Sequence, residues 1–185
     1  MPAAIAITIK GSGLPRFEEA VAALGSTKAT RAYRMALNTT GKRVFTQVKR
    51  TVAKQMGASQ ALVVKYGHLR RVPASGVSLE TRIESAGGYI PLMDFSARQT
   101  SKGVTASPWG QRRLFKSTFV LTRIGGHVFR RTGADRLPIE KLWGPAVPKE
   151  LVRDESKAAF ENVSSSFLPS EVARMVKQMT KGAVS

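Results

Sequence analysis

The residues that could do chemistry in this chain are few and widely separated. The 185 residues contain no cysteine and two histidines, His68 and His127, which lie far apart and without neighbouring acidic residues. A metal site needs several such ligands at short spacing, so we expect none. Without cysteine the chain also has no disulfide, and its fold must rest on packing alone, which suits a reducing cytoplasm.

Other chemical signatures are equally weak. Glu80 and Glu84 could share one face of a strand, but four residues of strand separate them by about 13 Å, too far for a coupled acid pair. No nucleophile-elbow pattern surrounds any serine. The glycines at 11–13 and 125–126 match no phosphate-binding or dinucleotide-binding spacing and indicate turns. We therefore expect no catalytic residues, no cofactor and no enzymatic activity.

The unusual property of the composition is charge. Thirty Lys and Arg against twelve Asp and Glu give a net charge of +18, while the hydrophobic fraction of 42% is ordinary for a globular domain. Such a chain favours negatively charged partners. The N-terminal residues lack the pattern of a signal peptide, and no run approaches twenty apolar residues. We therefore expect a soluble protein with no membrane partner.

The positive charge is concentrated in two stretches without acidic residues. Between Glu19 and Glu80 there are eleven basic residues and no acid, and between Phe95 and Ala134 there are eight more. Seven of the twelve acids lie instead within residues 135–171. Acidic residues normally alternate with basic ones on helix surfaces, so their absence is informative.

The stretch from about residue 26 to Met56 contains no proline and has apolar residues at helical spacing, which predicts one long amphipathic helix. This helix is either continuous or kinked near Gly41. Its apolar residues include Leu37, Val44 and Val48, and its opposite face carries several basic side chains. This face is either simply solvated or in contact with a phosphate backbone. The residues we expect to face DNA are Lys42, Arg43, Lys49 and Arg50.

The remaining elements favour an α+β fold. We expect one domain over residues 1–185, with a small, mainly antiparallel sheet covered by the long helix and by a C-terminal helix. The sheet would contain a strand at residues 3–9, a hairpin at 70–95 and strands at 115–131. A short helix is expected within residues 14–24 and another from Ser59 to Gly67.

Two further segments are less regular. Residues 96–117 are polar and have few apolar residues, which predicts a long extended loop or arm. Residues 133–148 carry three prolines, so they form neither one regular helix nor a central strand. Residues 149–185 form a C-terminal helical segment, which we expect to be kinked or broken at Pro169. Gly126-His127 would mark a turn or bulge, with His127 hydrogen-bonded.

Three segments in the second half of the chain together resemble the phage minor tail protein Z family. The first runs from Ile90 to Thr100 and continues in Lys102-Gly103-Val104. The second contains Phe119, Gly126-His127, Phe129 and Arg131. The third runs from Arg136 to Pro145, as Arg-Leu-Pro-Ile-Glu-Lys-Leu-Trp-Gly-Pro. No segment is a chemical motif, but their order and spacing are specific together, and the resemblance covers about residues 28–150.

The resemblance implies a tail completion protein, added at the head-proximal end of a long phage tail. Its implied partners are further copies of the chain in a ring, of which six would be expected, the tail tube or tail terminator, and the head-tail connector proteins. Non-specific contact with DNA in the lumen would be compatible. The implied location is the virion, after synthesis in the host cytoplasm. The residues expected at interfaces are Arg98, Lys102, Phe119, Leu137, Pro138, Leu142 and Trp143.

A rival hypothesis needs no ring. The chain could instead be a free-standing, non-specific nucleic-acid-binding protein whose basic helix coats DNA or RNA. Sequence-specific recognition has less support, because the aromatic residues do not alternate with the basic ones and no zinc finger or helix-turn-helix pattern is present. The two hypotheses differ in whether the protein is built into particles.

Overall fold

The computed structural model describes residues 5–10, 25–76 and 78–179 of the chain. These residues divide into two compact units. Unit 1 takes residues 49–69 and 85–156, and unit 2 takes the described residues of 5–48, 70–84 and 157–179. The chain passes between the units several times, and its longest helix supplies residues to both. The prediction of one domain over 1–185 therefore stays a prediction.

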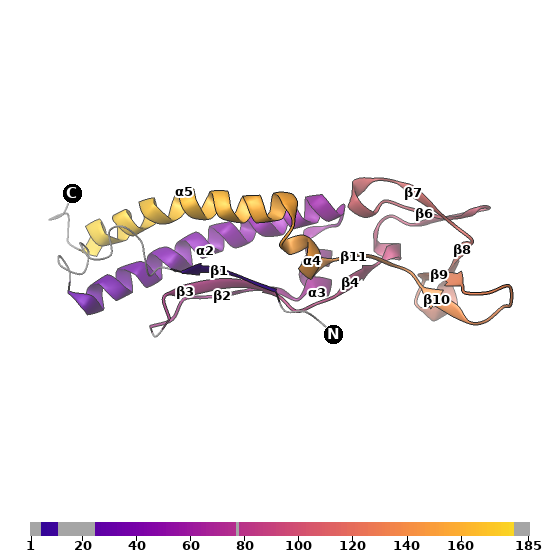
Figure 1. The fold of residues 1–185 in the computed structure, drawn as a ribbon, viewed down its shortest axis with the longest axis horizontal. Helices are drawn as coiled ribbons and strands as arrows, with labels where there is room; N and C mark the ends of the chain where they lie inside the picture. The colour runs from indigo at the N-terminus through magenta and orange to yellow at the C-terminus, as the bar shows by residue number, and fades with distance from the viewer. Residues whose placement is uncertain (1–4, 11–24, 77, 180–185) are drawn as a thin grey trace. The chain divides into compact units, whose positions relative to one another are not determined.

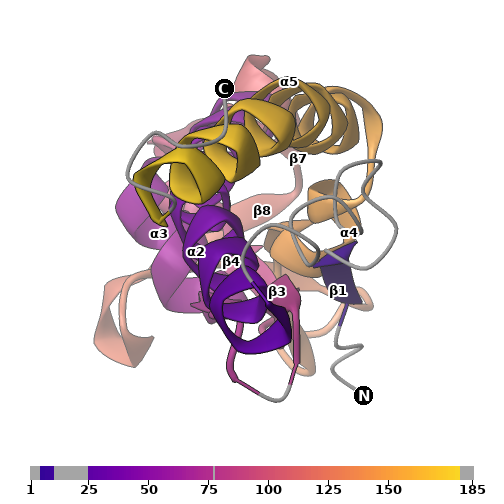
Figure 2. The ribbon, with the colours of Figure 1, turned by 90° about the vertical axis from the view of Figure 1, so that its left-hand side faces the viewer.

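Unit 2 consists of two long helices and a three-stranded sheet. Helix α2 (Ser26–Met56) supplies residues 26–48, and helix α5 (Asp154–Met179) supplies residues 157–179. The strands β1 (Ile5–Lys10), β2 (Leu69–Val72) and β3 (Glu80–Ser85) hydrogen-bond in the order β1-β3-β2. Figures 1 and 2 show α2 between this sheet and α5.

The core of unit 2 follows the helical repeat. Buried residues on α2 recur every three or four positions, which forms one apolar stripe along the helix. On α5, four buried side chains follow the same rule. The α2 residues are Ala29, Ala32, Tyr33, Ala36, Leu37, Val44 and Val48, and those of α5 are Phe160, Leu168, Val172 and Met175.

Gly41 has a different role from the predicted kink. The helix α2 continues through this position without interruption. A Cβ atom on Gly41 would lie 2.9 Å from Oγ1 of Thr81 in β3, so the glycine allows the sheet to approach the helix closely. Three residues earlier, the Asn38 amide donates to the carbonyl of Ala74 and accepts from its N–H, at 3.1 and 2.9 Å. These contacts fix the β2–β3 connection to the helix.

Unit 1 contains three small sheets. In the first, β4 (Tyr89–Pro91) pairs antiparallel with β11 (Trp143–Ala146). In the second, β5 (Arg98–Thr100), β6 (Gly103–Ala106) and β7 (Arg113–Lys116) form an antiparallel meander. In the third, β8 (Thr118–Leu121), β9 (His127–Arg131) and β10 (Ile139–Lys141) form another.

Short helices complete unit 1. They are α3 (Gln60–Gly67), α4 (Val147–Leu151) and the single-turn helices η1 (Leu92–Asp94), η2 (Pro108–Gly110) and η3 (Thr122–Ile124). Ser59 caps α3 by accepting a hydrogen bond from the N–H of Leu62, as the sequence predicts. Within the part of the chain that the structure describes, no helix is long and apolar enough to cross a membrane.

The α+β class and the two covering helices are confirmed, but the predicted single sheet is wrong. The strands of residues 115–131 belong to a different sheet from β1. The predicted hairpin over residues 70–95 is also wrong in its pairing. The strand β3 lies between β1 and β2, and β4 pairs instead with β11, more than fifty residues later.

Three local predictions also need revision. Residues 96–117 form the strands β5, β6 and β7 and not an irregular loop, while the alternative of an extended arm stays a prediction. The C-terminal segment is interrupted at residues 152–153, between α4 and α5, while α5 continues through Pro169. His127 does follow the glycine turn before β9, but its buried Nδ1 atom has no hydrogen-bond partner among the described residues. The helix expected within residues 14–24 lies outside the described residues.

Candidate interfaces for DNA and protein

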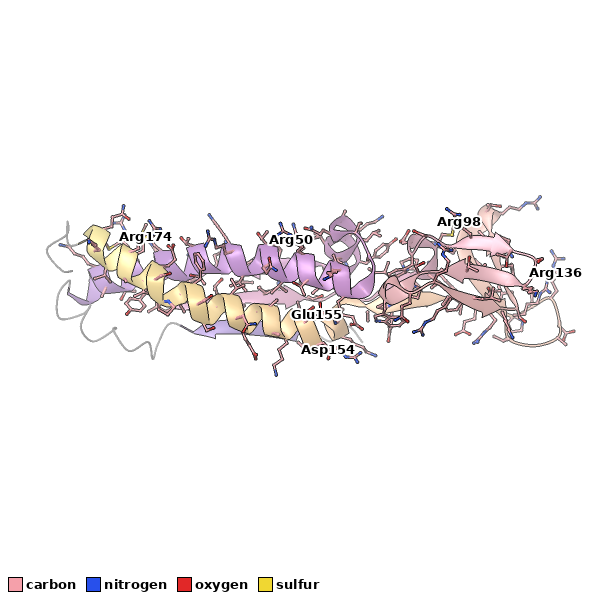
Figure 3. The ribbon with its side chains drawn as sticks, turned by 90° about the horizontal axis from the view of Figure 1, so that it is seen from above. Arg50, Arg98, Arg136, Asp154, Glu155 and Arg174 are labelled. Carbon is pink, nitrogen blue, oxygen red and sulfur yellow. The ribbon has the colours of Figure 1, made fainter. Side chains whose placement is uncertain are left out.

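The four residues predicted to face DNA all lie on α2. Residues seven apart on a helix lie about 20° from the same direction, so Lys42 aligns with Lys49 and Arg43 with Arg50. Lys42, Arg43 and Arg50 are exposed, and Lys49 is half-buried. Figure 3 shows Arg50 on this helix. Lys42 and Arg43 belong to unit 2, and Lys49 and Arg50 belong to unit 1, so the DNA-facing role of the four residues together stays a prediction.

The basic side chains of α2 have no acidic partner among the described residues. The ion pairs of the described chain join arginines and lysines elsewhere to the scarce carboxylates, as in Arg70–Glu84 and Arg174–Glu171. None involves the lysines and arginines of α2. Their charge is therefore not neutralised by the described part of the same chain, and it is available to an external anion.

Arg43 differs from the other three residues. Its guanidinium lies 3.7 Å from the centre of the Phe167 ring on α5, which is a cation–π contact within unit 2. Lys42 and Arg43 also line a groove of about 710 Å³ between α2 and α5, together with Phe167 and neighbouring hydroxyl and amide side chains. A stacked guanidinium can still bind an anion through its edge, but here it also helps to hold α5 against α2.

The predicted interface residues fall into two groups, all within unit 1. Phe119 and Leu142 are partly buried and have internal roles: Phe119 packs against Phe129 with ring centres 6.5 Å apart, and Leu142 donates its N–H to Val128 at 2.9 Å. Leu137 and Trp143 are exposed, at 66% and 50% of their surface. Large apolar side chains at this exposure are candidates for partner contacts.

The exposed members come from separate places in unit 1. Leu137 and Pro138 lie in the β9–β10 loop, which Thr132 closes through hydrogen bonds to the carbonyl of Pro138. Arg98 lies in β5, at the edge of its sheet, and Lys102 follows in the β5–β6 turn; both are exposed. Arg98 and Arg136, which precedes Leu137, are labelled in Figure 3.

One surface of unit 1 was not predicted from the sequence. A groove of about 500 Å³ is lined by Lys65, Tyr66, His68, Gly88, Tyr89 and Trp143. Burial raises the pKa of Tyr66 above its ordinary value, and the nearby Asp94 carboxylate raises it further, so the phenol stays protonated at neutral pH. The lining residues come from three distant segments, which is why no sequence motif indicates the groove.

A second unpredicted arrangement surrounds Glu150, whose side chain is only 6% exposed. Its carboxylate accepts hydrogen bonds from Gln55 Nε2 at 2.7 Å and from Trp109 Nε1 at 3.2 Å. The other end of Gln55 accepts from the hydroxyl of Ser156 at 2.8 Å. The hydrogen bonds of this network join the end of α2 to η2, to α4 and to the first turn of α5, all within unit 1. Among the described residues, no cluster of three or more His, Cys, Asp and Glu could hold a metal ion.

Comparison with known proteins gives one match. The model of a family described as Prophage minor tail protein Z (GPZ) matches residues 13–182 of the 185-residue chain. The match therefore extends beyond the segments that carry the resemblance in the sequence, and includes all of α2 through α5. No curated protein and no solved structure matches the chain.

Proposed function

Because the chain belongs to the prophage minor tail protein Z family, we propose that it completes the phage tail at its head-proximal end as a ring of identical subunits. Membership of the family makes it a structural protein of a phage tail, located in the virion among other tail proteins. The ring, its position and its contacts are our proposal. In this role the protein acts through its surfaces and not as an enzyme.

The observation that carries this proposal is the unneutralised basic face of α2. Lys42, Lys49 and Arg50 have no acidic partner among the described residues, so their charge is available to the phosphates of DNA passing through a tail lumen. A ring requires two different surfaces on each subunit that fit one another. The exposed residues of unit 1, including Leu137, Pro138 and Trp143, together with Arg98 and Lys102, are our candidates for contacts with neighbouring subunits, tail tube or terminator, and connector proteins.

Electron microscopy of assembled tails tests the position and the ring directly. We expect density for this chain at the head-proximal end, arranged with the rotational symmetry of the tail, and six copies per ring. Finding the chain at the distal end, or finding no copy in tails, would contradict the proposal. Strong binding of the purified protein to free DNA combined with absence from particles would instead favour a free-standing nucleic-acid-binding protein.

A charge-removal variant tests the contact with DNA. Replacing Lys42, Arg43, Lys49 and Arg50 by Gln should impair DNA entry or retention and so reduce infectivity, while tails still assemble. Because Arg43 also stacks on Phe167, a variant with only Lys42→Gln, Lys49→Gln and Arg50→Gln separates the loss of charge from the loss of packing. For the purified protein, removing three phosphate contacts should make the negative slope of log K against log salt shallower, by up to about 2.7.

The matched control removes the same number of charges elsewhere. Arg113, Lys116 and Arg123 are exposed residues of unit 1 that are not among our candidates. Changing these three residues to Gln should leave the salt dependence of DNA binding nearly unchanged. Unchanged infectivity of the α2 variant, or an equal effect of the control, would remove DNA contact from the proposed function.

A further inference from the structure

The groove of unit 1 combines aromatic rings with lysines. Tyr66 comes from α3, Tyr89 from β4 and Trp143 from β11. In the β4–β11 pair, Trp143 lies opposite Pro91, two residues from Tyr89, which places the Tyr89 and Trp143 side chains on one face. Tyr89 is 47% exposed and Trp143 is 50% exposed. Aromatic side chains at such exposure can bury a large area when a partner binds.

Each of the three rings has a lysine ammonium close to it. Lys65 lies 5.2 Å from the centre of Tyr66, Lys141 4.2 Å from Trp143, and Lys149 5.5 Å from Tyr89. Lys149 also donates a hydrogen bond to the Tyr89 hydroxyl at 3.1 Å. These cation–π contacts hold the ammonium groups around the groove without neutralising them.

The groove has few negative charges of its own. None of its described lining residues is acidic. Asp94 lies close enough to Tyr66 to raise the pKa of that phenol, and it offsets part of the charge of three lysines. Glu150, next to Lys149, forms an ion pair with Arg153 at 3.6 Å, so its negative charge is offset by that residue. An excess of positive charge therefore remains beside the rings.

The backbone that holds these side chains is fixed by hydrogen bonds. Gly87 and Gly88 donate their N–H groups to the carbonyls of Gly67 and Tyr66, at 2.9 and 3.0 Å, and Val147 donates to the carbonyl of Gly88 at 3.2 Å. The Ser85 hydroxyl donates to the same Gly67 carbonyl at 2.7 Å. The end of α3, the start of β4 and the start of α4 are thus joined, and the groove exists before any partner binds. Such preorganisation lowers the entropic cost of binding.

We propose that this groove docks a segment of another virion protein in which carboxylates flank an apolar side chain. The apolar side chain covers Tyr89 and Trp143, and the carboxylates bind the lysines at the edge. The inference rests on unit 1 alone and does not require the head-proximal position or the DNA contact proposed above. It identifies the chemistry of a partner that neither the family match nor the basic face of α2 specifies.

The same features disfavour duplex DNA as the occupant. The phosphate backbone of duplex DNA would bind the lysines, but it has no apolar group to cover the two half-exposed rings. Single-stranded bases could stack on the exposed parts of the rings, and a crosslink to nucleic acid in the test below would identify them. An acidic segment with an apolar side chain satisfies both parts of the surface together.

Photo-crosslinking in assembled particles tests the proposal. Tyr89 is replaced by the photoreactive amino acid benzoylphenylalanine, and after irradiation the crosslinked peptides are identified by mass spectrometry. We expect a peptide from a different virion protein, with acidic residues beside an apolar one. A crosslink to DNA, a crosslink to a second copy of this chain, or no crosslink would overturn the proposal. The same amino acid at the exposed Ile124 is the control and should not give this peptide.

Binding by the purified full chain gives an independent test. The probe is a fluorescent peptide of alternating Glu and Leu, compared with one in which Gln replaces Glu. We expect the acidic peptide to bind more tightly, and the combined variant Lys65→Gln, Lys141→Gln and Lys149→Gln to weaken its binding about tenfold or more. The charge-matched variant of Arg113, Lys116 and Arg123 should change it by less than about twofold. Equal weakening by both variants, or equal binding of both peptides, would refute the groove as the site.

Discussion

Replacing Glu150 by alanine is expected to lower the free energy of unfolding by about 3 kcal/mol. The side chain is buried, and its carboxylate accepts hydrogen bonds from Gln55 at 2.7 Å and from Trp109 at 3.2 Å. Alanine leaves both donors without this acceptor. Gln55 is half-buried and Trp109 is 45% exposed, so each lost hydrogen bond counts at about 1.5 kcal/mol, the low end for a charged partner. The ion pair with Arg153 adds little, because that side chain is 61% exposed and well screened by water.

Thermal unfolding followed by tryptophan fluorescence measures this effect. Both tryptophans, Trp109 and Trp143, lie in unit 1, so their signal reports on that unit. A loss of about 3 kcal/mol should lower the melting temperature by roughly 6–12 °C for a chain of this length. Glu155→Ala is the control, since Glu155 is exposed, lies in the first turn of α5 and should cost no more than about 1 kcal/mol. Similar melting temperatures for the two variants would show that the network does not stabilise unit 1.

The two neighbouring helices α2 and α3 could be predicted because their signals are local. The apolar repeat of α2, with Leu37, Val44 and Val48, lies within a single proline-free stretch, and the buried residues of the structure follow it. The helix α3 begins after a serine whose side chain caps it and ends at Gly67. Periodicity and caps act over three or four residues, so one sequence contains the complete pattern.

Strand pairing could not be predicted in the same way. The strand β4 is three residues long and pairs with β11 more than fifty residues later. The three residues of β5 are Arg, Gln and Thr, and all three are exposed. The strand therefore shows no alternation of apolar and polar residues in the sequence. A polar segment of this kind is indistinguishable from a loop until its neighbours are known. For this reason the sequence of residues 96–117 predicts a loop or arm, and the strand segments together predict a single sheet.

A candidate surface could likewise be predicted only where its residues lie close together in the sequence. The lack of acidic residues beside Lys42, Lys49 and Arg50 is visible in the sequence, because it is a property of one helix. The partner of Arg43 is not visible, because Phe167 lies on another helix far along the chain. The aromatic groove needs residues 66, 89 and 143 together, and only the paired strands and the end of α3 bring them to one place.

Replacing Gly87 by alanine should have an effect as large as that of Glu150→Ala, again about 3 kcal/mol. A Cβ atom at this position would lie 1.9 Å from the carbonyl oxygen of Tyr66 and within 2.6 Å of the Gly67 backbone. These are backbone atoms of a helix end and cannot rotate away as a flexible side chain would. The chain would have to separate here, breaking the hydrogen bonds from Gly87 and Gly88 to α3.

The adjacent residue provides the matched control. A Cβ atom on Gly88 would meet no atom within 4 Å, and the φ angle of Gly88 is outside the left-handed region. Gly88→Ala should therefore be neutral, or stabilise by up to about 1 kcal/mol through the unfolded state. Because the same hydrogen bonds position Tyr66 and Tyr89, Gly87→Ala should also weaken binding of the acidic peptide while Gly88→Ala preserves it. If both variants have the same melting temperature and bind the peptide equally, the close contact between α3 and the start of β4 does not position Tyr66 and Tyr89 in the groove.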